Sequence, residues 1–72
     1  MLTKVEIGKK YFHYKDKTKF YKVLEVGKLQ INDERYDLVE VVIYKALYED
    51  ASLGKIWVRP ISEFLEKFSE VE

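Results

Sequence analysis

Residues 38–48 of this 72-residue chain read LVEVVIYKALY, with β-favouring apolar side chains at odd and even positions alike. Val41 and Ile43 would share one face of a strand, and Val42 and Tyr44 the other. A strand with one face in water would alternate apolar and polar residues, so this pattern predicts a central strand covered on both faces. We expect the rest of the domain to be arranged around it.

Two stretches ahead of the central strand also have strand patterns. Residues 10–14 are a run of β-favouring aromatics, and residues 20–28 form a second apolar stretch. Its apolar positions change parity between Val23 and Leu24, which indicates a β-bulge. The lysine-rich residues 15–19 between the two stretches predict a hairpin loop. The other segments of this half are a lead-in or short edge strand at residues 1–9 and a turn at residues 32–34.

After the central strand, the sequence predicts a polar loop at residues 49–54, a short strand at residues 56–58 and then a helix. Pro60 ends the strand because proline cannot donate to the ladder. Ser62 is an available N-cap, or Pro60 is the first helical residue. The helix has one apolar stripe, made of Ile61, Phe64, Leu65 and Phe68. So short a helix is marginal alone, so we expect it to dock on one face of the central strand.

Composition limits the classes of protein. A chain of this length forms one domain, residues 1–72, with its core expected between residues 8 and 68. It has no cysteine and one histidine, which argues against a disulfide framework or a zinc site, and no cofactor is expected. No window approaches the roughly 20 apolar residues of a membrane span. The first ten residues lack the apolar segment of a secretory signal, so we expect a cytoplasmic protein.

The charges cancel over the whole chain, with 13 basic and 13 acidic side chains, but they are unevenly spread. Residues 1–28 hold eight lysines against three acidic residues, and residues 61–72 hold four glutamates against one lysine. The basic first part suits an anionic ligand. The alternative is that the two ends neutralise each other, within one chain or across a dimer.

Four ordered blocks carry a resemblance to a known family. They read GKKYFHYK from Gly8, YKVL from Tyr21, VIYKALY from Val42, and WVRP from Trp57 followed by Phe64. Together they resemble the domain-of-unknown-function 1653 (DUF1653) family of small bacterial proteins. The resemblance covers most of the chain, and it implies a compact, mainly β, SH3-like unit with a terminal helix. It implies almost nothing about function.

Pattern and resemblance together predict a mainly β fold. We expect a small SH3-like barrel of about 4–5 antiparallel strands with a short C-terminal α-helix. Its second strand would bend at the bulge.

The sequence offers little for catalysis. A nucleophilic mechanism needs a nucleophile, a base within reach and a group that orients the base. His13 is the single histidine, and the serines lie in a loop or the helix with no motif around them. No glycine-rich phosphate loop is present. We therefore expect a non-enzymatic protein with no catalytic residue.

A binding role rests on aromatic side chains with a few polar partners. Tyrosine and tryptophan bury flat apolar surfaces and keep one polar end, which suits a groove for a peptide or small ligand. The expected ligand-binding residues are Tyr11, His13, Tyr14, Tyr44, Trp57 and Arg59. Trp57 would anchor the ligand, and Arg59 would meet an anionic end. The alternative is that these aromatics are simply core, with Arg59 paired to a glutamate of the helix.

Two further functions stay open at this point. Single-stranded nucleic acid could bind along the basic strands, although the isoelectric point of about 6.6 is low for such a module. The residues for that alternative are Lys10, Lys15, Lys17 and Lys19. The third class is a structural protein that forms a homodimer through an exposed strand edge or helix surface.

Overall fold

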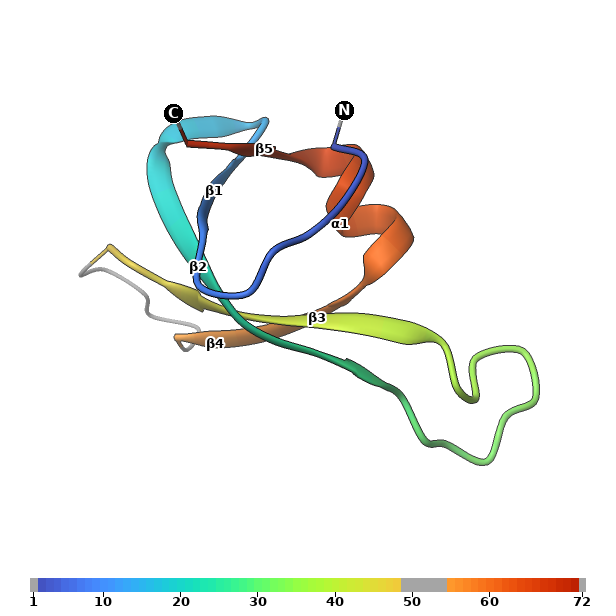
Figure 1. The fold of residues 1–72 in the computed structure, drawn as a ribbon. Coiled ribbons are helices and arrows are strands. Elements are labelled where there is room, and N and C mark those ends of the chain that lie inside the picture. The colour runs from blue at the N-terminus through green and yellow to red at the C-terminus, as the bar shows by residue number, and fades with distance from the viewer. Residues whose placement is uncertain (1, 49–54, 72) are drawn as a thin grey trace.

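The computed structural model describes residues 2–48 and 55–71 of the chain. In this part, five strands form one antiparallel sheet, and one short helix lies between the last two strands in the chain (Figure 1). The elements in chain order are β1 (Lys10–His13), β2 (Asp16–Lys28), β3 (Glu40–Ala46), β4 (Ile56–Pro60), α1 (Ile61–Lys67) and β5 (Phe68–Glu70). The predicted loop at residues 49–54 lies outside the described residues.

The sheet is open, with the strand order β4-β3-β2-β1-β5. The mainly β class, the antiparallel pairing and the C-terminal helix are therefore confirmed, whereas a closed SH3-like barrel is not. β4 and β5 are the two end strands, and neither pairs with the other. The sheet nevertheless curls, so that β1 runs steeply across the direction of β3 and β4 (Figure 1).

The long strand β2 produces this curl because it belongs to two ribbons. Its residues up to Lys22 pair with β1, and its residues from Tyr21 onward pair with β3. The register with β3 shifts between Val23 and Glu25. This irregularity confirms the bulge that the change of parity predicted, and a bulge increases local twist. The two halves of the sheet can then face each other across one core.

The predicted hairpin loop at residues 15–19 is wrong in its length. Only Tyr14 and Lys15 form the turn, and β2 begins at Asp16. The Asp16 carboxylate accepts hydrogen bonds from the backbone N–H and the hydroxyl of Thr18, at 3.0 and 2.6 Å. The lysines of this segment are exposed, so their like charges do not prevent an extended backbone.

The central strand is shorter than residues 38–48. β3 spans Glu40–Ala46, and Leu38 lies in the preceding turn with a φ of 64°. A branched apolar residue rarely adopts this left-handed conformation. Here the backbone N–H of Leu38 donates to the carbonyl of Leu29 at 2.6 Å, which closes the β2–β3 connection. The turn predicted at residues 32–34 therefore lies in the right connection but extends further along the chain, to Leu38.

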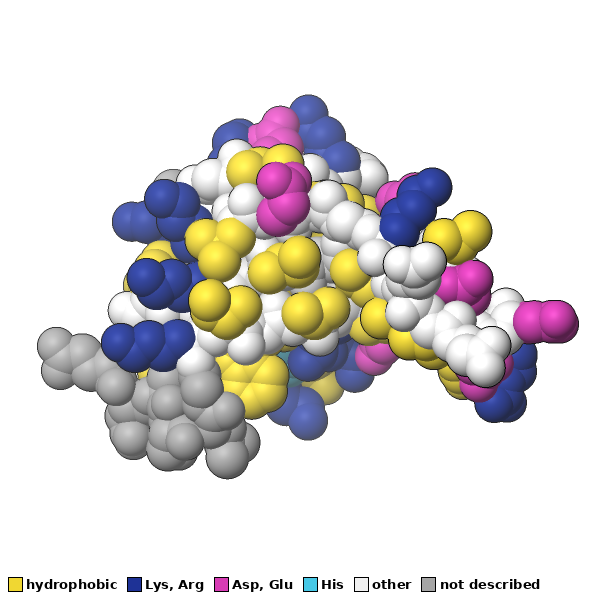
Figure 2. Space-filling model, turned by 90° about the horizontal axis from the view of Figure 1, so that it is seen from below, with side chains coloured by type: hydrophobic (Ala, Val, Ile, Leu, Met, Phe, Trp, Pro, Cys, Tyr) yellow, Lys and Arg dark blue, Asp and Glu magenta, His cyan; other side chains and the backbone are white. Residues whose placement is uncertain are grey.

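The two faces of β3 are covered unequally. Val42, Tyr44 and Ala46 point inward and are buried. On the outer face, Ile43 pairs with Val58 of β4, whose side chain is 58% exposed. On the same face Val41 is buried and Ile43 is half-buried, so the prediction of cover on both faces holds only in part. Figure 2 shows apolar side chains gathered on this underside.

The helix packs against the central strand, as its apolar stripe predicted: the ring of Phe64 meets that of Tyr44 on β3. Phe64 is fully buried, and its ring stacks on that of Phe68 with centroids 4.1 Å apart. However, Phe68 is the first residue of β5 and not the end of the helix. The N-cap is Pro60, with no side-chain cap hydrogen bond, so capping by Ser62 is wrong. β5 pairs with β1, and the sequence analysis did not foresee this short strand.

The first residues form a lead-in without strand structure. Leu2 donates its backbone N–H to the carbonyl of Leu65 at 3.0 Å, which ties this segment to the helix. The Lys9 ammonium contacts the carboxylates of both Glu6 and Glu70. One lysine of the basic first part thus pairs with an acidic residue of the last strand, as the neutralisation alternative expected.

Shortening Phe64 to alanine should cost about 3–5 kcal/mol of unfolding free energy, since its ring is wholly buried and a cavity would remain. Phe20→Ala is the matched control: the Phe20 ring is 39% exposed, so its loss should cost about 1–2 kcal/mol. Urea unfolding followed by circular dichroism measures both. Equal losses for the two variants would contradict the packing described above.

Candidate functional site

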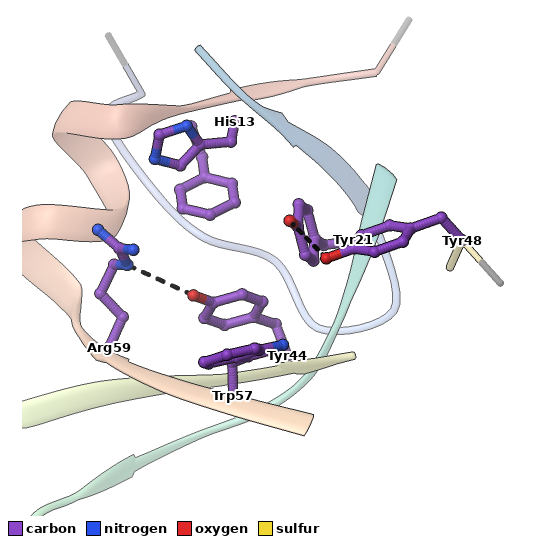
Figure 3. A pocket seen from close by; sticks show the side chains of 7 residues that line it. His13, Tyr21, Tyr44, Tyr48, Trp57 and Arg59 are labelled. Carbon is purple, nitrogen blue, oxygen red and sulfur yellow. Dashed lines mark hydrogen bonds between the residues drawn. The ribbon is translucent and has the colours of Figure 1, made fainter. Parts of the chain in front are cut away.

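The inner side of the sheet opens into a pocket of about 140 Å³ (Figure 3). Each of the five strands contributes at least one side chain to its lining, and one more comes from the residues that follow β3. The lining consists of His13, Tyr21, Tyr44, Tyr48, Trp57, Arg59 and Phe68. Residues far apart in the chain therefore meet at this pocket because the sheet curls.

Strand register places the polar and aromatic groups next to one another. Trp57 lies opposite Tyr44 in the β3–β4 pair, and Arg59 lies opposite Val42. His13 lies opposite Phe68 in the β1–β5 pair. Trp57 and Arg59 are two apart on one strand, so their side chains leave the same face, as the sequence indicated.

Arg59 is held in place by Tyr44 and Phe68, and its positive charge has no carboxylate partner among the described residues. Its Nε donates a hydrogen bond to the hydroxyl oxygen of Tyr44 at 3.4 Å, and its guanidinium lies 5.6 Å from the centre of the Phe68 ring. Within residues 2–48 and 55–71, no carboxylate forms a salt bridge with Arg59. The alternative that Arg59 pairs with a glutamate of the helix is thus not realised.

His13 is a neutral donor at this site. Its Nδ1 accepts the backbone N–H of Lys15 at 3.1 Å, so a neutral ring carries its proton on Nε2. Burial lowers the pKa of His13 below its usual 6.5, and the positive charges of Arg59, Lys15 and Lys67 lower it further. The imidazole therefore stays uncharged at neutral pH and offers one N–H.

Two tyrosines close another side of the pocket. The hydroxyl groups of Tyr21 and Tyr48 lie 3.2 Å apart, and their rings meet edge to face. Burial raises the pKa of Tyr21, and the hydrogen bond with Tyr48 raises it further, so the phenol remains protonated. The Lys19 ammonium lies 5.1 Å from the centre of the Tyr48 ring, which places one exposed cation near the pocket.

Trp57 is packed against the core yet only partly buried. Its indole Nε1 is itself inaccessible and has no hydrogen-bond partner among the described residues. A buried donor without a partner typically costs about 1–3 kcal/mol, which structures usually avoid. This feature distinguishes Trp57 from an ordinary core aromatic.

Four of the six expected ligand-binding residues line the pocket, namely His13, Tyr44, Trp57 and Arg59. Tyr11 belongs to the core instead, and its hydroxyl oxygen accepts the backbone N–H of Glu6 at 2.9 Å. Tyr14 is 55% exposed in the β1–β2 turn and does not line the pocket.

Two residues of the lining were not predicted from the sequence, namely Tyr21 and Phe68. Tyr21 could have been found by pairing, since it lies opposite Tyr11 in the β1–β2 hairpin. Phe68 was assigned to the helix stripe only, because β5 was not foreseen.

The four lysines of the nucleic-acid alternative do not form one row. Lys10 lies opposite Lys22 and precedes the inward-pointing Tyr11, so it faces outward. Lys19 instead lies beside the pocket, over Tyr48. Lys15 lies at the turn, 5.9 Å from the centre of the Tyr14 ring, and Lys17 is exposed on β2. A continuous basic track for a phosphate backbone is not built by these four, and nucleic-acid binding stays a prediction.

Two other kinds of feature are absent from the described part of the chain. No group of three or more histidine, cysteine or acidic side chains there could hold a metal ion. Nor does any helix in that part have the length and apolar character to cross a membrane.

Comparison with known proteins gives one match. The sequence model of a family described as "Protein of unknown function (DUF1653)" matches residues 9–72. No curated protein and no solved structure matches the chain. The match extends over all seven residues that line the pocket.

The His13 imidazole should titrate below pH 6.5 in the folded protein, because burial and nearby cations disfavour its charged form. As the pH falls below about 6.5, the unfolded chain then binds more protons than the folded protein does. The free energy of unfolding should therefore decrease as the pH decreases. NMR titration of the single histidine and urea unfolding at several pH values measure both effects.

His13→Asn is the control, since its side-chain carbonyl can still accept the Lys15 N–H. This variant should lose the His13 part of the pH dependence. A normal or raised histidine titration midpoint would contradict the description of the site.

Proposed function

Because the chain belongs to the DUF1653 family, for which no function is described, we propose a function from the pocket itself. The protein is a small non-catalytic binding module, and the pocket receives a small ligand or the end of a peptide. Trp57 and the tyrosines form the walls, and Arg59 meets a negatively charged group of the ligand.

One observation carries this proposal: Arg59 has no carboxylate partner in the described chain although it faces an aromatic pocket. A guanidinium near a low-dielectric surface is stabilised by an opposite charge, and Tyr44 supplies only a neutral acceptor. An anionic ligand would supply the missing partner. Trp57, with its unpartnered indole N–H, lies on the same strand and lines the same pocket.

The polar groups around the pocket also support binding over catalysis. His13 makes its one described hydrogen bond with a backbone N–H, and that bond uses the lone pair of Nδ1. A catalytic histidine usually has a carboxylate or carbonyl that orients it and a nucleophile within reach. The hydroxyl groups nearby belong to tyrosines, and the pKa of Tyr21 is raised, which makes it a poorer nucleophile at neutral pH.

Binding can be followed through the only tryptophan. A panel of small carboxylic acids, amines and amides, together with tripeptides that end in a free carboxylate or a carboxamide, is added to ¹⁵N-labelled protein. We expect the Trp57 indole N–H resonance to move with carboxylate-bearing members. Arg59→Met should weaken their binding at least tenfold while the protein stays folded, since the aliphatic stem and its packing are largely kept.

Lys45→Met is the matched control, because it removes a cation from an exposed position on β3. It should leave the affinity unchanged. The proposal fails if no member of the panel moves the Trp57 resonance, or if Arg59→Met binds the acids as well as the unmodified protein does.

A second function, pairing of two copies, is favoured by the outer face of the sheet. Ile56 and Val58 are 61% and 58% exposed, and both lie on the end strand β4. An end strand also has unpaired backbone groups that can extend a sheet into a second copy. We propose a homodimer that uses this face and leaves the pocket on the other side free.

Sedimentation velocity tests this second function over a range of protein concentrations. A dimer should appear at higher concentration, and Val58→Lys should abolish it because a charge would be buried between the copies. Lys10→Ala, on the outward side of β1, is the control and should dimerise normally. A monomer at every concentration would remove this function without affecting the pocket proposal.

A further inference from the structure

We propose that the pocket selects one six-membered aromatic ring that carries a carboxylate. This inference rests on the proposed function and names the class of ligand. Four properties of the pocket support it: the hydrogen-bonding capacity of its lining, its volume, the aromatic rings of its walls and the shape of its charged group.

The polar groups of the lining offer mainly donors. The two terminal amino groups of Arg59 form no hydrogen bond or salt bridge within the described chain, and Nε2 of His13 carries that ring's proton. The Tyr44 hydroxyl oxygen already accepts from Arg59, so its own hydrogen is left to donate. Among residues 2–48 and 55–71, no aspartate or glutamate lines the pocket. A bound group must therefore accept several hydrogen bonds and is best negatively charged.

The volume limits how much of the ligand can enter. The pocket measures about 140 Å³, whereas sites for drug-sized ligands measure roughly 300–1,000 Å³. An apolar cavity of about 150 Å³ is known to hold one benzene molecule. The space therefore corresponds to a single six-membered ring, and the rest of a larger ligand would extend outward.

The walls are suited to a ring. Tyr21, Tyr44 and Phe68 already meet one another edge to face, with ring centroids 5.4 to 5.6 Å apart. Aromatic pairs prefer this geometry or an offset stack, so the ring of a ligand could make the same kind of contact with these side chains. An aliphatic acid of the same charge would lack these contacts.

The charged group favours carboxylate over phosphate. Arg59 is the one cation in the lining, and its planar fork matches the two oxygens of a carboxylate. A phosphate dianion is usually held by more than one cation or by a series of backbone N–H groups. Lys19, the next cation, lies outside the lining and 3.9 Å from the Asp16 carboxylate, which offsets its charge.

Benzoate is the probe, and each comparison removes one property. Benzamide keeps the ring without the charge, acetate and inorganic phosphate keep a charge without the ring, and cyclohexanecarboxylate keeps charge and size without aromaticity. NMR titrations that follow the Trp57 indole N–H give the dissociation constants. We expect benzoate to bind at least tenfold tighter than benzamide, acetate and phosphate and severalfold tighter than cyclohexanecarboxylate. Arg59→Met should remove the preference over benzamide, and Lys45→Met should keep it.

The outcomes separate this inference from the function on which it rests. If benzamide binds as well as benzoate, or phosphate or acetate binds as well, the ligand class is wrong, while pocket binding by the peptides or other acids of the first panel would still stand. If benzoate fails to bind but a peptide moves the Trp57 resonance, the inference alone is overturned. If nothing moves this resonance, the inference and the proposed function both fail.

Discussion

The stacked rings of Phe64 and Phe68 hold the two ends of this fold together. Phe64 comes from a helix of seven residues, which would be marginal in isolation. Its ring meets Tyr11 of β1 and Tyr44 of β3 edge to face, at centroid distances of 5.4 and 5.3 Å. Phe68 follows directly and begins β5, which pairs with β1. The helix is therefore stable because its aromatic stripe docks, and docking brings the last strand back to the first.

The same aromatic cluster is shared between the core and the pocket. Tyr44 is almost fully buried and contacts Phe64, yet its hydroxyl group holds Arg59 at the pocket. Phe68 likewise stacks in the core and lies under the guanidinium. In a domain this small, there is too little interior for separate structural and binding residues. The sequence left open whether these aromatics form the core or a binding site. Tyr44 and Phe68 do both, since each is buried in the core and also lines the pocket.

The open sheet gives the molecule two unlike faces. The inner face buries aromatic rings around Arg59 and His13, whose polar groups remain available. The outer face presents the branched aliphatic side chains of Ile56 and Val58 on β4 to solvent. β3 has an apolar pattern on both faces, although only its inner face packs into the central aromatic cluster. A continuous apolar run shows that both faces are apolar and cannot show what lies against each of them.

Sequence alone was enough to predict the strand pattern, the bulge in β2, the end of β4 at Pro60 and the helix stripe. These features depend on the period of the side chains and on the geometry of proline, which are local properties. The three-dimensional structure was needed to show that the sheet stays open, that β5 forms, and that Tyr11 is core while Tyr21 and Tyr48 line the pocket. Such outcomes depend on which strand segments lie side by side, and this pairing is set by the coiling of β2 and the docking of Phe64, contacts between residues distant in the chain.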